Sequence, residues 1–407
     1  MKYRPLFLFA SSIIFLLGGC SLNDAKYSES DSKKIVLFGP EDNAYVDLLN
    51  DPERRYINAM HAEEKNMAES FRYRVNTLGG DTVKIKDYLS SYSRGKNRKI
   101  QLGFDTEGYN KDHEFVYHLA TKEDFSDEIT YQTKDYRLDI HSLKIDTKYY
   151  WKVNDTKNLA SSPVKSFVTM DGFRGMDAGK VDNVRDLGGK PVKGGKRIKQ
   201  GLIYRGSELN KEDYSANGGD HKFNLDDMAK DTFANIMHVS TEIDFRGDEE
   251  ANQISKSNLE SIANYNRQPI AGYGGLITSK SQYPKVKAIF EEFLAAKEDG
   301  SVYFHCWGGA DRTGSIAFLL GGLLGMSYTD LVIDFELTSF SYNLREHDNL
   351  GEYSDFPSLI EGLKTVSQTE ETYPDIQNMV EYYLTNKVGL TLEQLNTIKD
   401  NMLEEVI

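Results

Sequence analysis

The sequence is poor in cysteine. Only two cysteines occur among its 407 residues, Cys20 and Cys306. Cys20 belongs to the N-terminal signal described below, so Cys306 remains as the one thiol of the mature chain and an intrachain disulfide is excluded. A single thiol in an exported protein invites a functional interpretation. A buried, inert cysteine is the alternative.

The sequence is also short of positive charge. It contains 49 Lys and Arg against 63 Asp and Glu, which gives a formal net charge of −14. Such an acidic chain is not expected to bind nucleic acid, and a polyanionic substrate would need a local positive site. The 8 histidines are scattered without the spacing of metal ligands. The sequence therefore predicts neither a metal nor another cofactor.

Long apolar runs are rare as well. The N-terminal run from Leu6 to Leu17 follows Lys2 and Arg4 and is too short to span a bilayer comfortably. These features are typical of a signal peptide over residues 1–19. The run ends in Leu17-Gly18-Gly19-Cys20, which resembles the lipobox of bacterial lipoproteins. The resemblance implies cleavage before Cys20, lipidation of its thiol, and an exported protein held by lipid on a membrane of the bacterial cell envelope. An ordinary secretory signal is the alternative.

Residues 20–34 are polar and are expected to form a flexible tether. From 35 to 170, alternating runs between turn-forming residues predict an antiparallel β-sandwich, most clearly at 100–104, 115–119 and 149–153. The segment Leu143–Val153 resembles the corner and strand of fibronectin type III domains, with Tyr149 as the corner tyrosine. Residues 50–75 look helical and fit this domain poorly, so we treat them as an insertion. A spacer is the expected role of the sandwich, and a ligand-docking module is the alternative.

A different pattern follows residues 171–180, which are expected to be a linker. From Val181 to the C-terminus, helical and strand patterns alternate. This alternation predicts an α/β domain over residues 181–407, with a parallel-type sheet flanked by helices. The chain is therefore expected to carry an α/β domain preceded by an all-β sandwich domain.

One segment of the α/β region has the arrangement of a reactive site. Residues 301–306 form a short apolar run typical of a buried strand, a compact loop with two glycines follows, and a helix begins near Arg312. In such a unit the loop N–H groups and the positive end of the helix dipole converge on one point and bind phosphate. An arginine at the loop end can hold two phosphate oxygens. The same positive field stabilises a thiolate, which free cysteine forms only near about pH 8.5.

This segment resembles a known signature. His305-Cys306, five further residues and Arg312-Thr313-Gly314 match the loop of protein tyrosine and dual-specificity phosphatases. A bacterial tyrosine phosphatase subfamily with the loop HCxxGKDRTG also resembles this chain at residues 183–189, 202–209 and 243–250. The resemblance implies a cysteine phosphatase fold. One departure is Ala310, where the subfamily has a lysine that is associated with binding the extra phosphates of phosphoinositides.

The resemblance implies roles for the loop residues. Cys306 is the nucleophile that forms a phosphocysteine, and Arg312 holds the equatorial oxygens. Thr313 can donate its hydroxyl to the sulfur, or it is a plain residue of the first helical turn. His305 is expected to orient the loop and tune the thiolate, with direct proton transfer as the alternative. The substrate-binding part of the loop comprises Trp307, Gly308, Gly309 and Ala310.

The leaving oxygen needs a proton, and three aspartates are candidates for supplying it. Asp311 ranks first because it lies in the loop, where a bound phosphate dianion favours a protonated carboxyl. Asp244 and Asp248 lie near the end of another strand and are the runners-up. Asp244 is also a candidate for binding substrate, or it simply pairs with Arg246 or Arg185.

Two further groups of residues are candidates for the cleft. Arg185, with Asp186 and Arg205, can line it, and an ion-pair cluster behind the loop is the alternative. The polar segment Asn210–Asn224 can form a rim or lid, with a solvated loop as the alternative.

The sequence predicts a cysteine-dependent hydrolase that acts on phosphotyrosine proteins, with or without dual specificity. The first alternative is a phosphatase of small phosphomonoesters such as inositol phosphates. The exported location favours this alternative, whereas the acidic composition and Ala310 oppose it. The second alternative is a catalytically silent phosphate-binding module, which the retention of Cys306, Asp311, Arg312 and Thr313 opposes. The expected partner is therefore a phosphorylated protein or a small phosphomonoester, together with the membrane that holds the lipid anchor.

Overall fold

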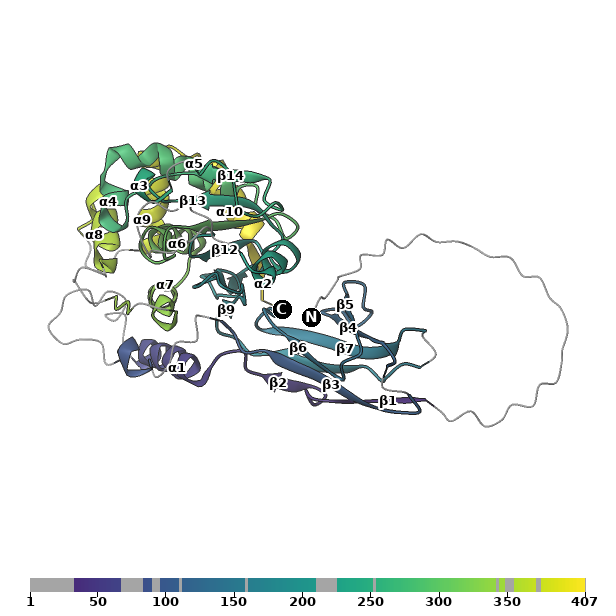
Figure 1. Cartoon of the computed structure of the whole chain (residues 1–407). Coiled ribbons are helices and arrows are strands. Elements are labelled where there is room, and N and C mark those ends of the chain that lie inside the picture. Colours follow the sequence, from purple (N-terminus) through teal and green to yellow (C-terminus); the bar gives the residue numbers. More distant parts are fainter. Residues whose placement is uncertain are drawn as a thin grey trace, which may run out of the picture. The chain divides into compact units, whose positions relative to one another are not determined.

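The computed structural model describes residues 33–66, 83–89, 96–109, 112–157, 160–209, 225–251, 254–341, 344–347, 355–370 and 375–406 (Figure 1). The predicted signal peptide, Cys20, most of the tether and the Asn210–Asn224 segment lie outside these residues. The chain divides into two compact units. The first comprises the chain up to Leu48 with Lys99–Ile140 and Asp146–Met170, and the second comprises Leu49–Arg98, His141–Ile145 and the chain from Asp171 onward.

The first unit contains two sheets, in the orders β1-β3-β6 and β2-β8-β7-β4-β5. Phe104 of one sheet packs against Phe115 and Tyr117 of the other, with 4.7 and 5.4 Å between ring centroids, so the two sheets face each other across an aromatic core. Their strands are β1 (Lys34–Phe38), β2 (Ala44–Val46), β3 (Ile100–Glu107), β4 (Phe115–Ala120), β5 (Ile129–Thr133), β6 (Arg137–Ile140), β7 (Thr147–Asp155) and β8 (Lys165–Thr169).

The three strands predicted most clearly are confirmed as β3, β4 and β7. Along β7 the buried residues alternate with partly exposed ones, and Trp151 is fully buried. Tyr149 stacks on Phe167 at 5.4 Å between centroids. The pairing is antiparallel as predicted, except that β2 and β8 run parallel.

The helix α1 (Asp51–Asn66) belongs to the second unit. Its side chains Tyr56, Ile57 and Met60 recur at helical spacing and are buried in the hydrophobic core of that unit. The Tyr56 ring lies 6.1 Å from that of Phe340, and its hydroxyl donates to Glu336. The helical prediction is therefore confirmed as far as Asn66. The helix lies in a segment that interrupts the sequence of the first unit and belongs to the second unit.

The predicted linker is also part of the second unit. Arg174–Gly175 forms the edge strand β9, and Phe173, Met176 and Ala178 are buried. These apolar side chains pack into the hydrophobic clusters of that unit. Residues 171–180 therefore do not separate two domains in the way that their composition predicts.

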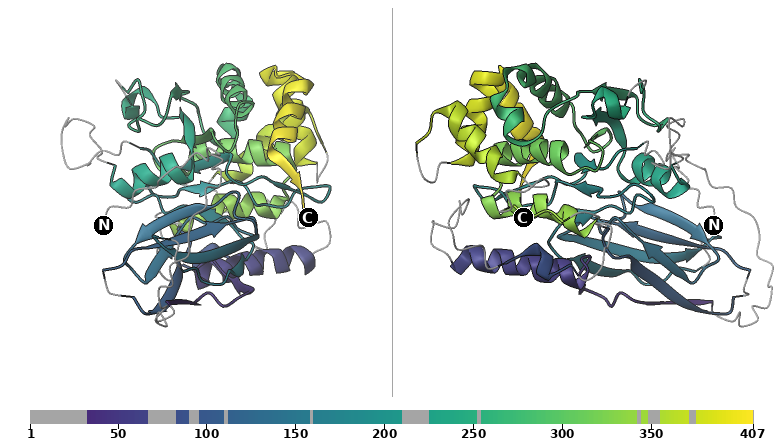
Figure 2. Two further views of the ribbon diagram at one scale, coloured as in Figure 1. Left: turned by 90° about the vertical axis from the view of Figure 1, so that its right-hand side faces the viewer. Right: turned by 60° about the vertical axis from the view of Figure 1, so that its left-hand side comes forward.

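A mixed six-stranded sheet forms the centre of the second unit, in the order β14-β13-β15-β12-β10-β9. Figure 2 shows the ribbon from two further sides, with the helices of the C-terminal half in green and yellow. β14, β13, β15 and β12 run parallel, and β10 and β9 add an antiparallel edge. The strands are β9, β10 (Arg185–Asp186), β12 (Ile203–Gly206), β13 (Val239–Asp244), β14 (Asn264–Arg267) and β15 (Ser301–His305). Every residue of β15 is buried, as is typical of a central parallel strand covered on both faces.

Helices pack around this sheet, and α4, α8 and α9 lie side by side (Figure 1). Thr391 and Gln394 form a capping box at the start of α10 (Leu392–Met402). Directly after α10, β16 (Leu403–Glu405) pairs with β11 (Lys196–Ile198) in a small antiparallel sheet. The remaining elements are η2 (Ile85–Asp87), α2 (Asp227–Asp231), η3 (Thr232–Ile236), α3 (Asp248–Ala251), α4 (Tyr273–Thr278), η4 (Lys280–Gln282), α5 (Tyr283–Phe293), α6 (Asp311–Leu324), α7 (Tyr328–Glu336), η5 (Leu337–Phe340), α8 (Phe356–Ser367), α9 (Ile376–Tyr382), η6 (Tyr383–Val388) and α10 (Leu392–Met402).

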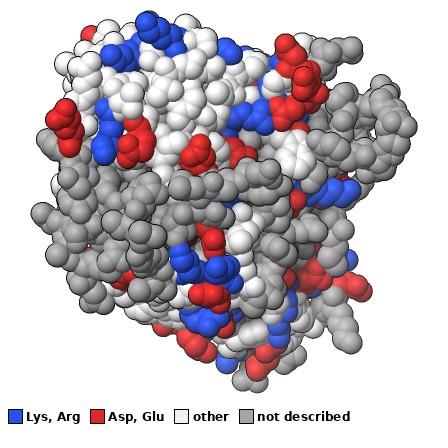
Figure 3. All heavy atoms as spheres, turned by 90° about the vertical axis from the view of Figure 1, so that its left-hand side faces the viewer, with Lys and Arg blue, Asp and Glu red and all other residues white. Residues whose placement is uncertain are grey.

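The described surface carries charges of both signs. On the face drawn in Figure 3, acidic and basic side chains are interspersed, so the acidic composition does not produce a uniformly negative face there. Within the described ranges, no helix combines the length and the apolar character that a membrane span needs.

Candidate active site

The predicted nucleophile lies at the carboxyl end of the central strand. β15 ends at His305, and the strand register places His305 opposite Gly206 of β12 and Asp244 of β13. The carboxyl ends of these parallel strands meet at one edge of the sheet, which is where open α/β sheets bind their ligands. Cys306 follows at this edge and is 2% exposed.

The loop 307–310 connects Cys306 to α6 and turns its carbonyl groups toward the protein behind it. Three successive carbonyls accept hydrogen bonds there: Trp307 from Glu208 N–H at 3.1 Å, Gly308 from Asn183 Nδ2 at 3.1 Å, and Gly309 from Asn183 Nδ2 at 3.1 Å and Arg205 Nη2 at 2.8 Å. In a trans peptide the C=O and N–H groups point in opposite directions. The N–H groups of residues 308–310 therefore point away from these donors, toward the other side of the loop.

Gly309 makes this close packing possible. Its φ of +69° lies in the left-handed region, and a Cβ there would lie 2.3 Å from the carbonyl oxygen of Gly206. A side chain at this position would push the loop off β12. The loop geometry thus depends on glycine at residue 309.

Arg312 lies in the first turn of α6 and is held in place before any substrate binds. Its Nη1 and Nη2 donate to the two carboxylate oxygens of Glu250 at 2.5 and 2.7 Å, and Nη1 also lies 3.4 Å from the Phe245 carbonyl oxygen. Burial acts to lower the pKa of Arg312, but the bond to Glu250 and the charge of Cys306 outweigh burial and raise it. The hydrogen bond from Arg312 lowers the pKa of Glu250. The guanidinium is therefore charged and oriented near the nucleophile.

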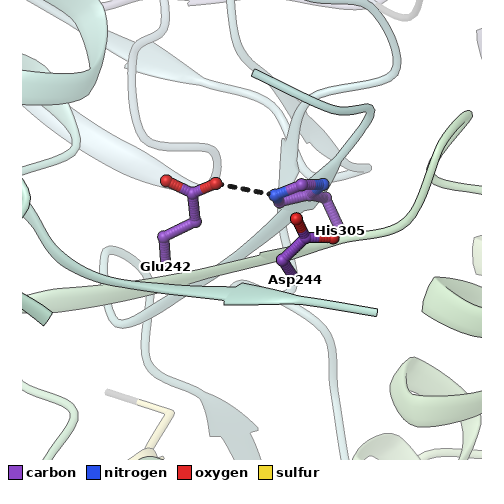
Figure 4. A group of neighbouring side chains, drawn as sticks. All are labelled: Glu242, Asp244 and His305. Carbon is purple, nitrogen blue, oxygen red and sulfur yellow. Dashed lines mark hydrogen bonds and ion pairs between the residues drawn. The ribbon is translucent and has the colours of Figure 1, made fainter. Parts of the chain in front are cut away.

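His305 is fully buried behind the loop. Its Nδ1 lies 2.9 Å from the carbonyl oxygen of Cys306, and its Nε2 lies 2.9 Å from Oε1 of Glu242 (Figure 4). Burial acts to lower the pKa of His305, but the charge of Asp244 and the bond to Glu242 outweigh burial and raise it. Because both nitrogens face acceptors, the charged ring fits best. This geometry favours the role that orients and tunes the nucleophile.

Glu242, Asp244 and His305 place ligand-type atoms within 4.8 Å of one another (Figure 4). However, Asp244 already accepts hydrogen bonds from the backbone N–H, Nε and Nη2 of Arg246 and from the hydroxyl of Tyr265. His305 uses both ring nitrogens. A metal ion would have to displace these partners, so the cluster is better described as an ion-pair network.

Asp244 is 0% exposed. Burial acts to raise its pKa, but the charges of His305 and Arg246 and the hydrogen bonds from Arg246 hold it below the ordinary value. The predicted contact of Asp244 with substrate is therefore replaced by its pairing with Arg246.

Arg185 also lies behind the loop, as the alternative interpretation has it. Its Nε and Nη2 donate to Oδ1 and the carbonyl oxygen of Asp334 at 3.1 and 2.7 Å. Arg205 Nη1 donates to Oδ2 of the same aspartate at 2.5 Å. Burial acts to raise the pKa of Asp334, but Arg185 and Arg205 outweigh it and hold the pKa low. Arg185, Asp186 and Arg205 are 2%, 0% and 0% exposed, as the ion-pair alternative requires. Arg205 bonds the loop directly at Gly309, whereas Asp186 pairs with Arg174 of β9.

Asp311 is the one of the three acid candidates that is both exposed and next to the loop. Its side chain is 42% exposed and lies within reach of Tyr273 and Arg345. Asp248 is 86% exposed but pairs with Arg267 at 2.5 Å on another element.

The remaining predicted residues lie in and around the same loop. Thr313 is fully buried, and its hydroxyl makes no hydrogen bond to any described residue. Ala310 is buried at the start of α6, and Trp307, next to the nucleophile, is 37% exposed. The structure therefore brings together Cys306, the loop, Arg312, Thr313 and Asp311.

The sequence did not reveal three of the neighbouring residues. Glu250 lies within residues 243–250, which resemble the phosphatase subfamily. The sequence therefore marked its position but did not reveal its contact with Arg312. Tyr273 and Arg345 lie 38 and 34 positions from Asp311 along the chain. Because no local pattern links such distant positions, only the folded chain reveals them.

The chain is similar in part to several known proteins. A tyrosine-protein phosphatase of Nostoc commune is 41% identical over 56 residues, which cover 14% of this chain and 19% of that protein, so the match spans under a fifth of its length. The human tyrosine phosphatase-like serine/threonine/tyrosine-interacting protein matches with 20% identity over 33% of this chain and 83% of its own, at a TM-score of 0.24.

The core catalytic domain of the PP-IP phosphatase SIW14 from S. cerevisiae matches with 13% identity over 48% of this chain and 95% of its own, at a TM-score of 0.25. The model of the family described as "Tyrosine phosphatase family" matches residues 176–404, which is more than half of the chain and includes the whole loop. The chain belongs to the tyrosine phosphatase family.

Proposed function

We propose that the chain hydrolyses phosphate monoesters through a phosphocysteine intermediate. The supporting observation is the loop 307–310, whose three carbonyls are bound from behind so that three N–H groups share the opposite side. The Cys306 sulfur attacks phosphorus as the bond to the leaving oxygen breaks. Arg312 and the loop N–H groups bind the phosphoryl oxygens, where negative charge is concentrated.

A proton completes each half of the reaction. Asp311 donates it to the leaving oxygen, so that a neutral alcohol or phenol departs. Water then attacks the phosphocysteine, the Asp311 carboxylate accepts a proton from that water, and the thiolate is released. Thr313 can donate its hydroxyl to the sulfur in this second step.

Phosphotyrosine is the proposed substrate group. Trp307 offers an exposed aromatic surface next to the nucleophile, and aromatic rings pair favourably with a phenyl leaving group. Ala310 supplies no charge for a second phosphate. We therefore expect phosphotyrosyl peptides to be hydrolysed with a higher kcat/KM than phosphoseryl peptides or inositol phosphates.

The test compares these substrates on the native protein and on Cys306→Ser. Turnover is expected to vanish in the variant, while phosphate binding and the fold persist because only the sulfur changes. Mass spectrometry of the acid-quenched native enzyme should show a phosphate on Cys306. Turnover by Cys306→Ser near the native rate would overturn the covalent mechanism, and a preference for inositol phosphates would overturn the proposed substrate.

We also propose that the protein is exported and lipid-anchored through Cys20 in the bacterial cell envelope, with a fibronectin type III-like spacer. The support comes from the N-terminal sequence and from the aromatic core of the first unit. Labelled fatty acid should be incorporated in the native host and not in Cys20→Ala. Mature protein without lipid, or with an N-terminus elsewhere, would contradict the anchor.

A further inference from the structure

The Asp311 carboxylate is held by two side chains that come from distant parts of the chain. The Tyr273 hydroxyl donates to its Oδ1. Arg345 Nη2 lies 3.2 Å from the same Oδ1 and 3.3 Å from Oδ2. The Tyr273 hydroxyl therefore donates to Oδ1, and Arg345 donates a hydrogen bond to Oδ2 while its charge also lies close to Oδ1. Each carboxylate oxygen of Asp311 thus has a donor from a distant part of the chain.

Tyr273 reaches this position through an unfavourable backbone conformation. Its φ is +55°, which is uncommon for a residue with a bulky side chain. Its N–H donates to Oγ of Ser315 at 2.7 Å, and the next N–H, of Gly274, donates to Oγ of Ser358 at 2.9 Å. Strained residues that neighbouring groups hold firmly concentrate at functional sites. Here the conformation directs a phenol at Asp311.

The backbone of Arg345 is held by Ser339. The Arg345 N–H donates to Oγ of Ser339 at 2.7 Å, and the same hydroxyl donates to the Arg345 carbonyl oxygen at 3.0 Å. The Arg345 side chain is 5% exposed, whereas that of Asp311 is 42% exposed. A buried cation thus approaches the carboxylate from the protein side and leaves its other side accessible.

Helix stability alone does not explain this arrangement. An acidic residue in the first turn of α6 is already stabilised by the helix dipole. Asp311 would need neither a strained tyrosine nor a buried arginine for that purpose. Burial and the nearby charge of Asp311 raise the pKa of Tyr273, so its phenol remains a hydrogen-bond donor at neutral pH.

We propose that Tyr273 and Arg345 are positioning residues for the proton transfers of Asp311. The proposal rests on the function proposed above. When Asp311 gives its proton to the leaving oxygen, the P–O bond breaks, the S–P bond forms, and negative charge appears on the carboxylate. Tyr273 and Arg345 stabilise that charge and keep the carboxyl group directed at the leaving oxygen. In the second half-reaction they hold the same carboxylate ready to take a proton from water.

The test measures rates for aryl phosphates with leaving groups of increasing basicity in Tyr273→Phe, Arg345→Gln and Arg345→Lys. Loss of one donor to a charged group is expected to slow the poorest leaving groups by about 10- to 100-fold. Activated aryl phosphates should be slowed much less, because they leave without a proton. Arg345→Lys retains the positive charge and should restore most of the rate that Arg345→Gln loses with the poorest leaving groups.

Tyr265→Phe is the matched control, because Tyr265 donates to Asp244 at 2.8 Å in the same way but away from the loop. Its leaving-group dependence should equal that of the native enzyme. One outcome would overturn the inference while the proposed function stands. In it, activity depends on Cys306 and Asp311→Asn shows a leaving-group dependence, but Tyr273→Phe and Arg345→Gln do not. If the native enzyme lacks Cys306-dependent activity, the function itself has failed.

Discussion

Asp311 and Asp244 are close to the same sheet edge, but their surroundings give them different chemistry. Asp244 is buried and accepts hydrogen bonds from Arg246 and Tyr265, so it has no accessible proton to give. Asp311 is 42% exposed and lies in the first turn of α6, one residue before Arg312. Both residues are aspartates, so their exposure and their hydrogen-bond partners determine which of them can donate a proton.

Asp311→Asn is expected to slow hydrolysis of phosphotyrosyl substrates by about 100- to 10,000-fold, the usual contribution of general acid catalysis. Activated aryl phosphates should be affected much less. Steady-state kinetics on both substrate types measures the difference.

Asp244→Asn is the control for this prediction. It should lower stability, because it weakens a buried ion pair, without creating a leaving-group dependence. If Asp244→Asn showed the leaving-group dependence and Asp311→Asn did not, the general acid would be Asp244, at the end of β13.

Glu208 has an environment that makes the stability of the protein depend on pH. Burial raises the pKa of Glu208 to about 7, although Arg246 acts to lower it. In the unfolded chain a glutamate titrates near about 4.3. The raised pKa in the native state therefore contributes stability that is fully present at low pH and is lost as the pH rises through about 7.

Glu208→Gln should remove this dependence. Relative to the native protein, the variant should gain up to about 3 kcal/mol in free energy of unfolding between about pH 5 and about pH 8. Urea unfolding of both proteins across this range measures the change. An equal difference at every pH would show that Glu208 does not titrate there.

At the scale of elements, the phosphate-binding loop depends on its contact with β12. Gly309→Ala would place a Cβ 2.3 Å from the Gly206 carbonyl oxygen in a residue with positive φ. Gly194 shares the positive φ, at +83°, but has nothing within 4 Å of its Cβ position. The two glycines therefore separate the effect of the close contact from that of the backbone conformation.

Gly194→Ala should lower the free energy of unfolding by about 1 to 2 kcal/mol and leave kcat/KM unchanged. Gly309→Ala should lower stability further and also lower kcat/KM, because the loop must move away from Asn183 and Arg205. Thermal unfolding and phosphotyrosyl kinetics on both variants provide the comparison. Equal effects of the two substitutions would mean that the contact with Gly206 is unimportant.

At the scale of the whole molecule, the catalytic unit is discontinuous in sequence. It includes α1 and β9, which precede the predicted boundary at residue 181. Tyr56, Ile57 and Met60 of α1 are buried in its core, and each such side chain contributes about 1.5 to 3 kcal/mol when buried. Their sum is comparable with the total stability of a typical domain, about 5 to 15 kcal/mol.

A fragment of residues 181–407 should therefore be much less stable than the full chain, and it should lose activity at lower temperature. A chain that begins at Lys33 keeps every described residue and should unfold like the full chain. Circular dichroism melting curves and activity after heating measure both. A fragment 181–407 as stable as the chain from Lys33 would show that α1 and β9 are dispensable.

Local patterns were enough to predict several parts of this protein. The buried strand and the loop with Cys306 and Arg312 lie within a few residues of one another, so the spacing of the residues specifies their geometry. The alternating pattern likewise located β3, β4 and β7.

Tertiary structure decided what depends on contacts between distant residues. It assigned α1 to the catalytic unit, buried Arg185 and Asp244, and left Asp311 accessible. It also brought Tyr273 and Arg345 to Asp311. Burial and pairing arise only when distant segments pack together in the core. The local pattern of one segment therefore does not specify which distant residues become its partners.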